Sequence, residues 1–151
     1  MTGSLGEARP RGRLGSAMVL LAIGAFVIAL YLGITKLQGG VLVCGIVEGC
    51  ETVSDSEYAE ILGIPTGLFG AGASLVTALA ALGWWLRAER RALLAAYVVG
   101  LLSLPIVIWL TYLEVFVIEA ICIWCVTYAV LVIVGWLTAS WVLWQGRQEA
   151  A

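Results

Sequence analysis

Four long apolar runs dominate the chain, and short polar segments separate them. The runs cover residues 17–35, 66–86, 92–113 and 118–144. Each reaches the roughly 20 residues that an α-helix needs to cross a hydrocarbon core about 30 Å thick. The first run exceeds the roughly 7 to 15 apolar residues of a signal peptide, so we expect it to be retained. The pattern predicts an all-α membrane protein built as a bundle of four transmembrane helices.

The longest internal polar segment, residues 36–65, contains a further helical pattern. Ser54 and Glu57 have the spacing of a capping box, which marks the start of a helix. The apolar residues that follow recur at i, i+3 and i+4 on one helix face, and they are Tyr58, Ile61 and Leu62. A helix this short cannot span a bilayer. We expect it to lie in the membrane interface and cover the bundle, although an ordinary ordered connector fits the same residues.

The overall composition supports a lipid environment. Hydrophobic residues make up 62% of the chain and charged residues 12%, with a mean hydropathy of +1.05, whereas soluble domains have roughly a quarter charged residues. With a net charge of −2 and scattered basic residues, we expect no nucleic acid partner. The chain has no histidine, which excludes histidine-ligated metals and Ser-His or Cys-His catalytic pairs. Carboxylates, hydroxyls and thiols must therefore carry the chemistry.

The basic residues fall almost entirely on one side of the predicted helices. Seven of the eight lie there, namely Arg9, Arg11, Arg13, Arg87, Arg90, Arg91 and Arg147. Only Lys36 lies on the other side. By the positive-inside rule the basic side is cytoplasmic, so residues 1–16 and 145–151 form cytoplasmic tails around a membrane domain of residues 17–144. The loop 36–65 and the turn near residues 114–119 then lie outside.

All four cysteines fall on that outer side. Cys44 and Cys50 lie in the long loop, and Cys122 and Cys125 form a C-x-x-C pair where the fourth helix opens. An even number of cysteines in an oxidising compartment favours disulfides. A C-x-x-C ring is too small to stabilise a fold much, whereas a helix N-terminus stabilises a thiolate. The four cysteines are therefore candidate catalytic residues for thiol-disulfide exchange.

Two other interpretations fit four cysteines. Four thiolates in two closely spaced pairs could bind zinc, but thiolate-bound zinc belongs mainly to reducing compartments, so we expect no metal. A non-enzymatic membrane scaffold could carry two structural disulfides. Mild thiols distinguish it from an enzyme, because catalytic disulfides are reduced readily and structural ones resist.

The positions of these residues resemble those of a known family. The cysteine pairs, Ser56 six residues after Cys50, the segment 63–65 at the entrance of the second helix and the C-x-x-C of residues 122–125 recur as a set in the vitamin K epoxide reductase family. The chain resembles in particular its bacterial single-domain members, and the likeness covers nearly the whole chain. It implies an integral protein of the bacterial inner membrane, with its active site on the outer face.

The resemblance also implies a four-helix bundle around a quinone, of the menaquinone, ubiquinone or vitamin K type. In that family the loop pair, here Cys44 and Cys50, exchanges electrons with a thioredoxin-like (DsbA-like) extracytoplasmic protein. Cys50 would then pass the electrons to Cys122, and Cys125 would face the quinone. Ser56 matches a family serine near the active site. The implied function is a membrane oxidoreductase that drives disulfide-bond formation.

Further residues are candidates for contacting the quinone or for donating protons to it. Trp124, inside the C-x-x-C, is an aromatic that could stack on a planar ligand. The family's vertebrate members carry a tyrosine four residues after the last cysteine, where this chain has Ala129, and Tyr128 comes one residue earlier. Quinone reduction needs two protons, and without histidine the candidates are water, the thiols, Tyr128, Glu114 and Glu119.

A related enzyme class is the nearest alternative. The quinone reductases of the disulfide-bond formation protein B type also have four helices and two cysteine pairs. Their C-x-x-C lies in the first outer loop, whereas the C-x-x-C of this chain comes second. The sequence therefore favours a quinone-dependent disulfide oxidoreductase of the vitamin K epoxide reductase type.

Overall fold

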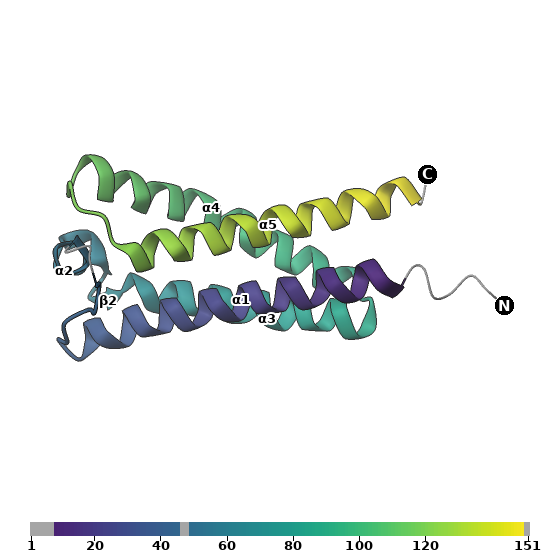
Figure 1. Cartoon of the computed structure of the whole chain (residues 1–151), viewed down its shortest axis with the longest axis horizontal. Helices are drawn as coiled ribbons and strands as arrows, with labels where there is room; N and C mark the ends of the chain where they lie inside the picture. Colours follow the sequence, from purple (N-terminus) through teal and green to yellow (C-terminus); the bar gives the residue numbers. More distant parts are fainter. Residues whose placement is uncertain (1–7, 46–48, 150–151) are drawn as a thin grey trace.

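Four long helices running along one axis make up most of the molecule (Figure 1). The computed structural model describes residues 8–45 and 49–149. The long helices are α1 (Ala8–Leu37), α3 (Thr66–Arg87), α4 (Arg90–Phe116) and α5 (Ile123–Glu149). Each contains a stretch long and apolar enough to cross a membrane. The predicted all-α membrane protein with four transmembrane helices is therefore confirmed.

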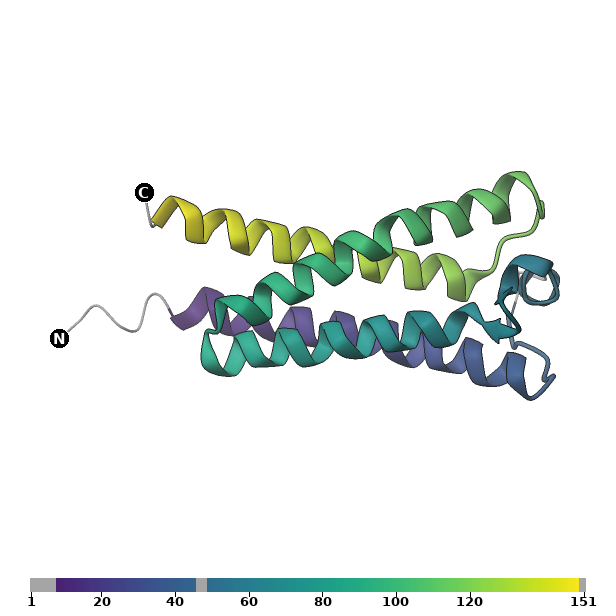
Figure 2. The same ribbon diagram turned by 180° about the vertical axis from the view of Figure 1, so that it is seen from behind.

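The helices close into a ring in which α1 contacts α3, α3 contacts α4, α4 contacts α5 and α5 contacts α1. Glycine lets α1 and α3 approach closely: a Cβ atom on Gly67 would lie 2.7 Å from the backbone nitrogen of Gly33. Small residues serve this purpose in lipid, where helices associate by close packing. Seen from behind, α4 crosses the bundle obliquely from its start beside α3 (Figure 2).

The two ends of the bundle differ in charge and chemistry. The start of α1, the end of α5 and the turn between α3 and α4 lie at one end (Figure 1). Arg13, Arg87, Arg90 and Arg147 belong to these segments. Both cysteine pairs lie at the opposite end, as the predicted parity of the helices required.

The first loop has a short helix, but not where the sequence predicted it. The helix is α2 (Gly49–Ser54), which ends at the residue expected to begin it. A 3-10 turn, η1 (Glu57–Ala59), follows, and then β1 (Glu60–Ile61) pairs antiparallel with β2 (Ile64–Pro65). The predicted amphipathic helix beginning at Ser54 is therefore wrong.

Local hydrogen bonds and a tight turn explain this difference. The Ser56 hydroxyl donates a 2.7 Å hydrogen bond to the carbonyl of Val53 just beyond α2, so Ser56 takes part in ending a helix. Leu62 and Gly63 have φ values of 55° and 78°, which form the hairpin turn and interrupt helical geometry. Gly63 tolerates this conformation, and Leu62 at the tip is 99% exposed.

The connection from α4 to α5 also departs from the prediction. Helix α4 continues through Phe116, beyond the expected end at residue 113, and α5 begins at Ile123 instead of residue 118. Glu119 has a φ of 55°, and the Ala120 N–H donates to the carbonyl of Glu114 at 3.1 Å. The residues before Ile123 are thus tied back onto the end of α4. Glu114, expected in an outer turn, lies within a helix.

Candidate active site

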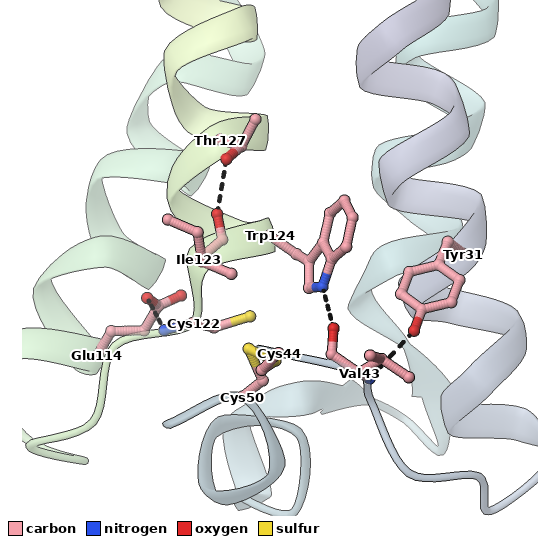
Figure 3. Close-up of a disulfide and its surroundings, with 9 residues drawn as sticks. All are labelled: Tyr31, Val43, Cys44, Cys50, Glu114, Cys122, Ile123, Trp124 and Thr127. Carbon is pink, nitrogen blue, oxygen red and sulfur yellow. Dashed lines mark hydrogen bonds between the residues drawn. A yellow bond between two sulfur atoms is a disulfide. The ribbon is translucent and has the colours of Figure 1, made fainter. Parts of the chain in front are cut away.

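The loop pair and the C-x-x-C pair meet at one end of the bundle. Cys44 and Cys50 are joined by a disulfide, whereas Cys122 and Cys125 are free thiols. Cys50 and Cys122 are 0% and 1% exposed, and they pack in one buried cluster with Leu42. Figure 3 shows the side chain of Cys122 extending toward the disulfide. Two pairs far apart in sequence are therefore in position to exchange electrons.

The close approach depends on a glycine next to the loop cysteine. A Cβ atom on Gly49 would lie only 2.7 Å from the backbone nitrogen of Ile121. No side chain fits there unless the backbone moves. Gly49 therefore lets the start of α2 rest directly on the connection that leads into Cys122.

The two loop cysteines face different surroundings. Cys44 is partly exposed, whereas Cys50 is fully buried. Cys50 also lines a cavity together with Cys122 and Cys125, and Cys44 is not among the described residues that line it. Cys44 is thus the more accessible residue of the loop pair, and Cys50 lies with the C-x-x-C cysteines at the cavity.

The cavity has a volume of about 110 Å³ and lies beneath α2, among the four long helices. Its wall is mostly apolar, with Leu42, Val53, Pro65, Val107, Leu110 and Leu113 among the residues that form it. Ser56, Glu114 and Tyr128 contribute polar groups beside the thiols. An apolar pocket with a few placed polar groups is typical of a site for a small organic ligand.

Cys122 occupies the N-cap position of α5, because its carbonyl accepts the Val126 N–H at 3.0 Å. A hydrogen bond from the Cys125 side chain lowers the pKa of the Cys122 thiol below its ordinary value, and backbone N–H groups of Cys125 and Trp124 act in the same direction. Burial and the nearby Glu114 oppose this shift. A lowered pKa favours the thiolate, which is the nucleophile in disulfide exchange.

Glu114 is a buried carboxyl group beside both C-x-x-C thiols. It is 3% exposed, and its Oε2 accepts the Cys122 N–H at 3.3 Å (Figure 3). Its carboxyl group also lies beside the Cys125 side chain. Sequence reasoning named Glu114 only among several proton donors, because the third run was expected to end at Leu113. An ionisable residue inside a membrane helix is by itself an indication of function. Glu114 meets this criterion only once the helix is known to extend beyond residue 113.

Residues 16–140 match the model of the "Vitamin K epoxide reductase family". The match spans most of the chain and includes both cysteine pairs. The chain belongs to the vitamin K epoxide reductase family. A search of curated protein sequences finds no match to it. Family membership makes the chain a membrane oxidoreductase, of a family that acts on disulfides with quinones.

Ser56 and Tyr128 are among the hydroxyl-bearing residues that line the cavity, but the hydroxyl protons of these two are already donated. The Ser56 hydroxyl donates to the Val53 carbonyl at 2.7 Å. The Tyr128 hydroxyl donates to the Gly70 carbonyl at 3.2 Å and accepts a 3.4 Å hydrogen bond from Ser74. Both residues therefore border the cavity, as a site residue should, but neither hydroxyl proton points to a ligand.

Trp124 has a different environment from the one expected. Its indole N–H donates to the carbonyl of Val43 at 2.9 Å, and its ring packs on Tyr31 with ring centroids 5.4 Å apart. The hydroxyl of Tyr31 accepts the Val43 N–H at 3.2 Å, so both backbone groups of Val43 are bound (Figure 3). Trp124 is not among the described residues that line the cavity. This geometry indicates that Trp124 holds Val43, the residue before Cys44, and does not stack on a ligand.

Replacing Trp124 with Phe should loosen the loop while leaving an aromatic ring on Tyr31. The variant loses one hydrogen bond to Val43, a net loss of about 1 kcal/mol, or roughly fivefold in local opening. Hydrogen exchange should quicken at Val43 and Cys44, and mild thiols should reduce the loop disulfide faster. Trp141→Phe is the matched control, since Trp141 is 48% exposed on the outside of α5. Equal exchange rates in the two variants would contradict the proposed hold on Val43.

Proposed function

We propose that this protein oxidises the cysteines of a thioredoxin-like protein and passes the electrons through its two cysteine pairs to a quinone. The observation that carries the proposal is the burial of Cys50 and Cys122 in one cluster, between a partly exposed loop cysteine and an apolar cavity. The family match supports the same class of enzyme. The free C-x-x-C thiols beside the loop disulfide fit a relay better than a scaffold with two structural disulfides.

The difference in exposure between the cysteines suggests the order of exchange. A thiolate of the partner attacks Cys44, the partly exposed sulfur, and releases Cys50 as a thiolate. Cys50 then attacks Cys122 in an oxidised C-x-x-C pair, and Cys125 leaves as the second thiolate. The partner's second thiolate attacks the mixed disulfide with Cys44, so the partner leaves with its own disulfide and Cys44 becomes a thiolate. Cys44 then attacks Cys50 and frees Cys122. The product has an oxidised loop and a reduced C-x-x-C, which is the state of the cysteines in the structure.

The cavity fits the head group of a membrane quinone. Its apolar wall suits a ring, its volume of about 110 Å³ limits what enters, and Cys125 borders it. An adjoining groove of about 620 Å³ between α3 and α4 shares Leu113 and Tyr128 with the cavity and offers apolar surface for a longer chain. A bound quinone would accept the two electrons and two protons that a dithiol releases when it closes. Cys125 would deliver electrons, while α2 covers the cavity and limits access of water.

The function is tested by measuring quinone reduction with the purified protein in lipid nanodiscs and a reduced thioredoxin-like protein as donor. The wild type should form quinol in proportion to the partner oxidised. Cys125→Ser should lower the rate at least about 100-fold, because the C-x-x-C can no longer close. Thr127→Ser, which lies outside the cavity lining, should keep the rate. A wild type that oxidises the partner without forming quinol would overturn the proposal.

The order of exchange predicts a trapped intermediate. In a Cys44→Ser, Cys125→Ser double variant, neither resolving thiol remains, so Cys50 and Cys122 should form a stable disulfide. Peptide mass spectrometry under non-reducing conditions identifies that bond. The matched control is Cys50→Ser, Cys125→Ser, in which the outward position of Cys44 should give little bond to Cys122. If the control forms more of its disulfide than the test variant, the roles of the loop cysteines are reversed.

We also propose that the arginine-rich end of the bundle is cytoplasmic, in a bacterial inner membrane, with the cysteines outside. In reduced, intact cells a membrane-impermeant maleimide should label Cys44 or Cys50. As a control, Gly146→Cys can be placed in a cysteine-free variant, because a Cβ at Gly146 meets nothing within 4 Å. That residue should react only after the membrane is opened. The opposite labelling pattern would invert the orientation.

A further inference from the structure

We propose that Glu114 is a catalytic residue that carries the proton exchanged between Cys125 and the bound acceptor. The inference rests on the proposed function and adds to it the route of the proton. Its basis is geometric: one carboxyl group reaches the backbone of Cys122 and the side chain of Cys125, and it lines the same cavity as both thiols.

The surroundings of Glu114 are unusual for a structural carboxylate. It is 3% exposed, and burying a carboxylate is costly unless its charge is compensated. In the described part of the chain no basic side chain pairs with it. Lys36 lines the same cavity, but its ammonium group pairs with Asp55 at 3.6 Å and Glu60 at 3.8 Å. The protonation of Glu114 therefore depends on the two thiols beside it.

The other candidate proton donors are placed less favourably. Tyr128 donates its hydroxyl proton to Gly70, and Ser56 donates its own to Val53. Glu119 is exposed and is not among the described residues that line the cavity. The chain has no histidine. Among the side chains that face the thiols, Glu114 is the one able both to take and to return a proton.

The proton and electron balance gives Glu114 a defined step. Cys125 passes its S–H proton to the Glu114 carboxylate and becomes a thiolate, while Cys122 keeps its own S–H proton until the bond to Cys125 forms. A sulfur–sulfur bond then forms between Cys122 and Cys125, and the electron pair leaves with the quinone acceptor. Glu114 returns its proton to that acceptor, which also takes up the proton from Cys122. Two electrons and two protons have left the dithiol, and Glu114 is a carboxylate again.

Glu114→Gln separates proton transfer from a structural role. The glutamine has nearly the same volume and can still accept the Cys122 N–H, but it cannot take a proton. We expect an intact loop disulfide, an unchanged KM for the quinone and a kcat about 100-fold lower with a flattened pH profile. Glu114→Asp should restore part of the rate. Glu119→Gln, which changes an exposed carboxylate of the same connection, should behave like the wild type.

Infrared difference spectroscopy tests the proton directly and needs no quinone. When the C-x-x-C of a Cys44→Ser, Cys50→Ser variant is closed by a rapidly mixed small oxidant, a carboxylic-acid C=O band should appear and then decay, because Glu114 is a carboxylate before and after the step. Glu114→Gln should remove that transient band.

The outcomes separate this inference from the proposed function. If Glu114→Gln keeps the full rate while Glu114→Ala loses it, Glu114 only holds Cys122 and the proton role is wrong. A spectrum without the band contradicts the inference in the same way. If the wild type fails to reduce quinone, the proposed function fails, and the infrared band still decides whether Glu114 exchanges a proton with the thiols.

Discussion

The packing of Cys50 and Cys122 in one buried cluster is the arrangement on which the rest of the site depends. Disulfide exchange requires sulfur atoms to meet, and each of these two is almost completely withdrawn from solvent. One comes from a loop and the other from the start of α5, so the loop must be held down on the bundle. Gly49 provides the space for this approach, and Trp124 holds Val43 on the other side of Cys44.

The cysteines also differ in how deeply they are buried, and this difference suggests different roles. Cys44 remains partly exposed, whereas Cys50 and Cys122 are buried, so in the proposed relay their exchange takes place out of solvent. Shielding matters because an exposed C-x-x-C thiolate would react with any passing disulfide or oxidant. The arrangement therefore makes the loop pair the entrance to the C-x-x-C. The hydrogen bonds on Val43 are local and modest, which suits a loop whose cysteines must change partners.

A chain without histidine must move protons by other means. The geometry offers a buried carboxyl group at the end of α4, tied to the N-terminal turn of α5 by the Cys122 N–H. The first turn of α5 lowers the pKa of Cys122 through hydrogen bonds from the Cys125 side chain and from the backbone N–H groups of Cys125 and Trp124. The proposed nucleophile and proton acceptor are thus joined by one short segment, in which Glu119 turns the backbone with a positive φ. The hydrogen bonds that hold the start of α5 in place are therefore also those that act on the Cys122 thiol.

The sequence by itself determined the four spans and the gathering of Cys44, Cys50, Cys122 and Cys125 at one end, because lipid dictates the length and polarity of each helix and the parity of spans places the loops. Only the tertiary structure decided the rest. Ser54 has the pattern of a helix start but ends α2, since the neighbouring backbone turns into a hairpin. Trp124 and Glu114 owe their positions to hydrogen bonds with Val43 and Cys122, which periodicity along the chain does not reveal. Contacts between segments distant in sequence, or across a turn with positive φ, are settled only when the helices pack.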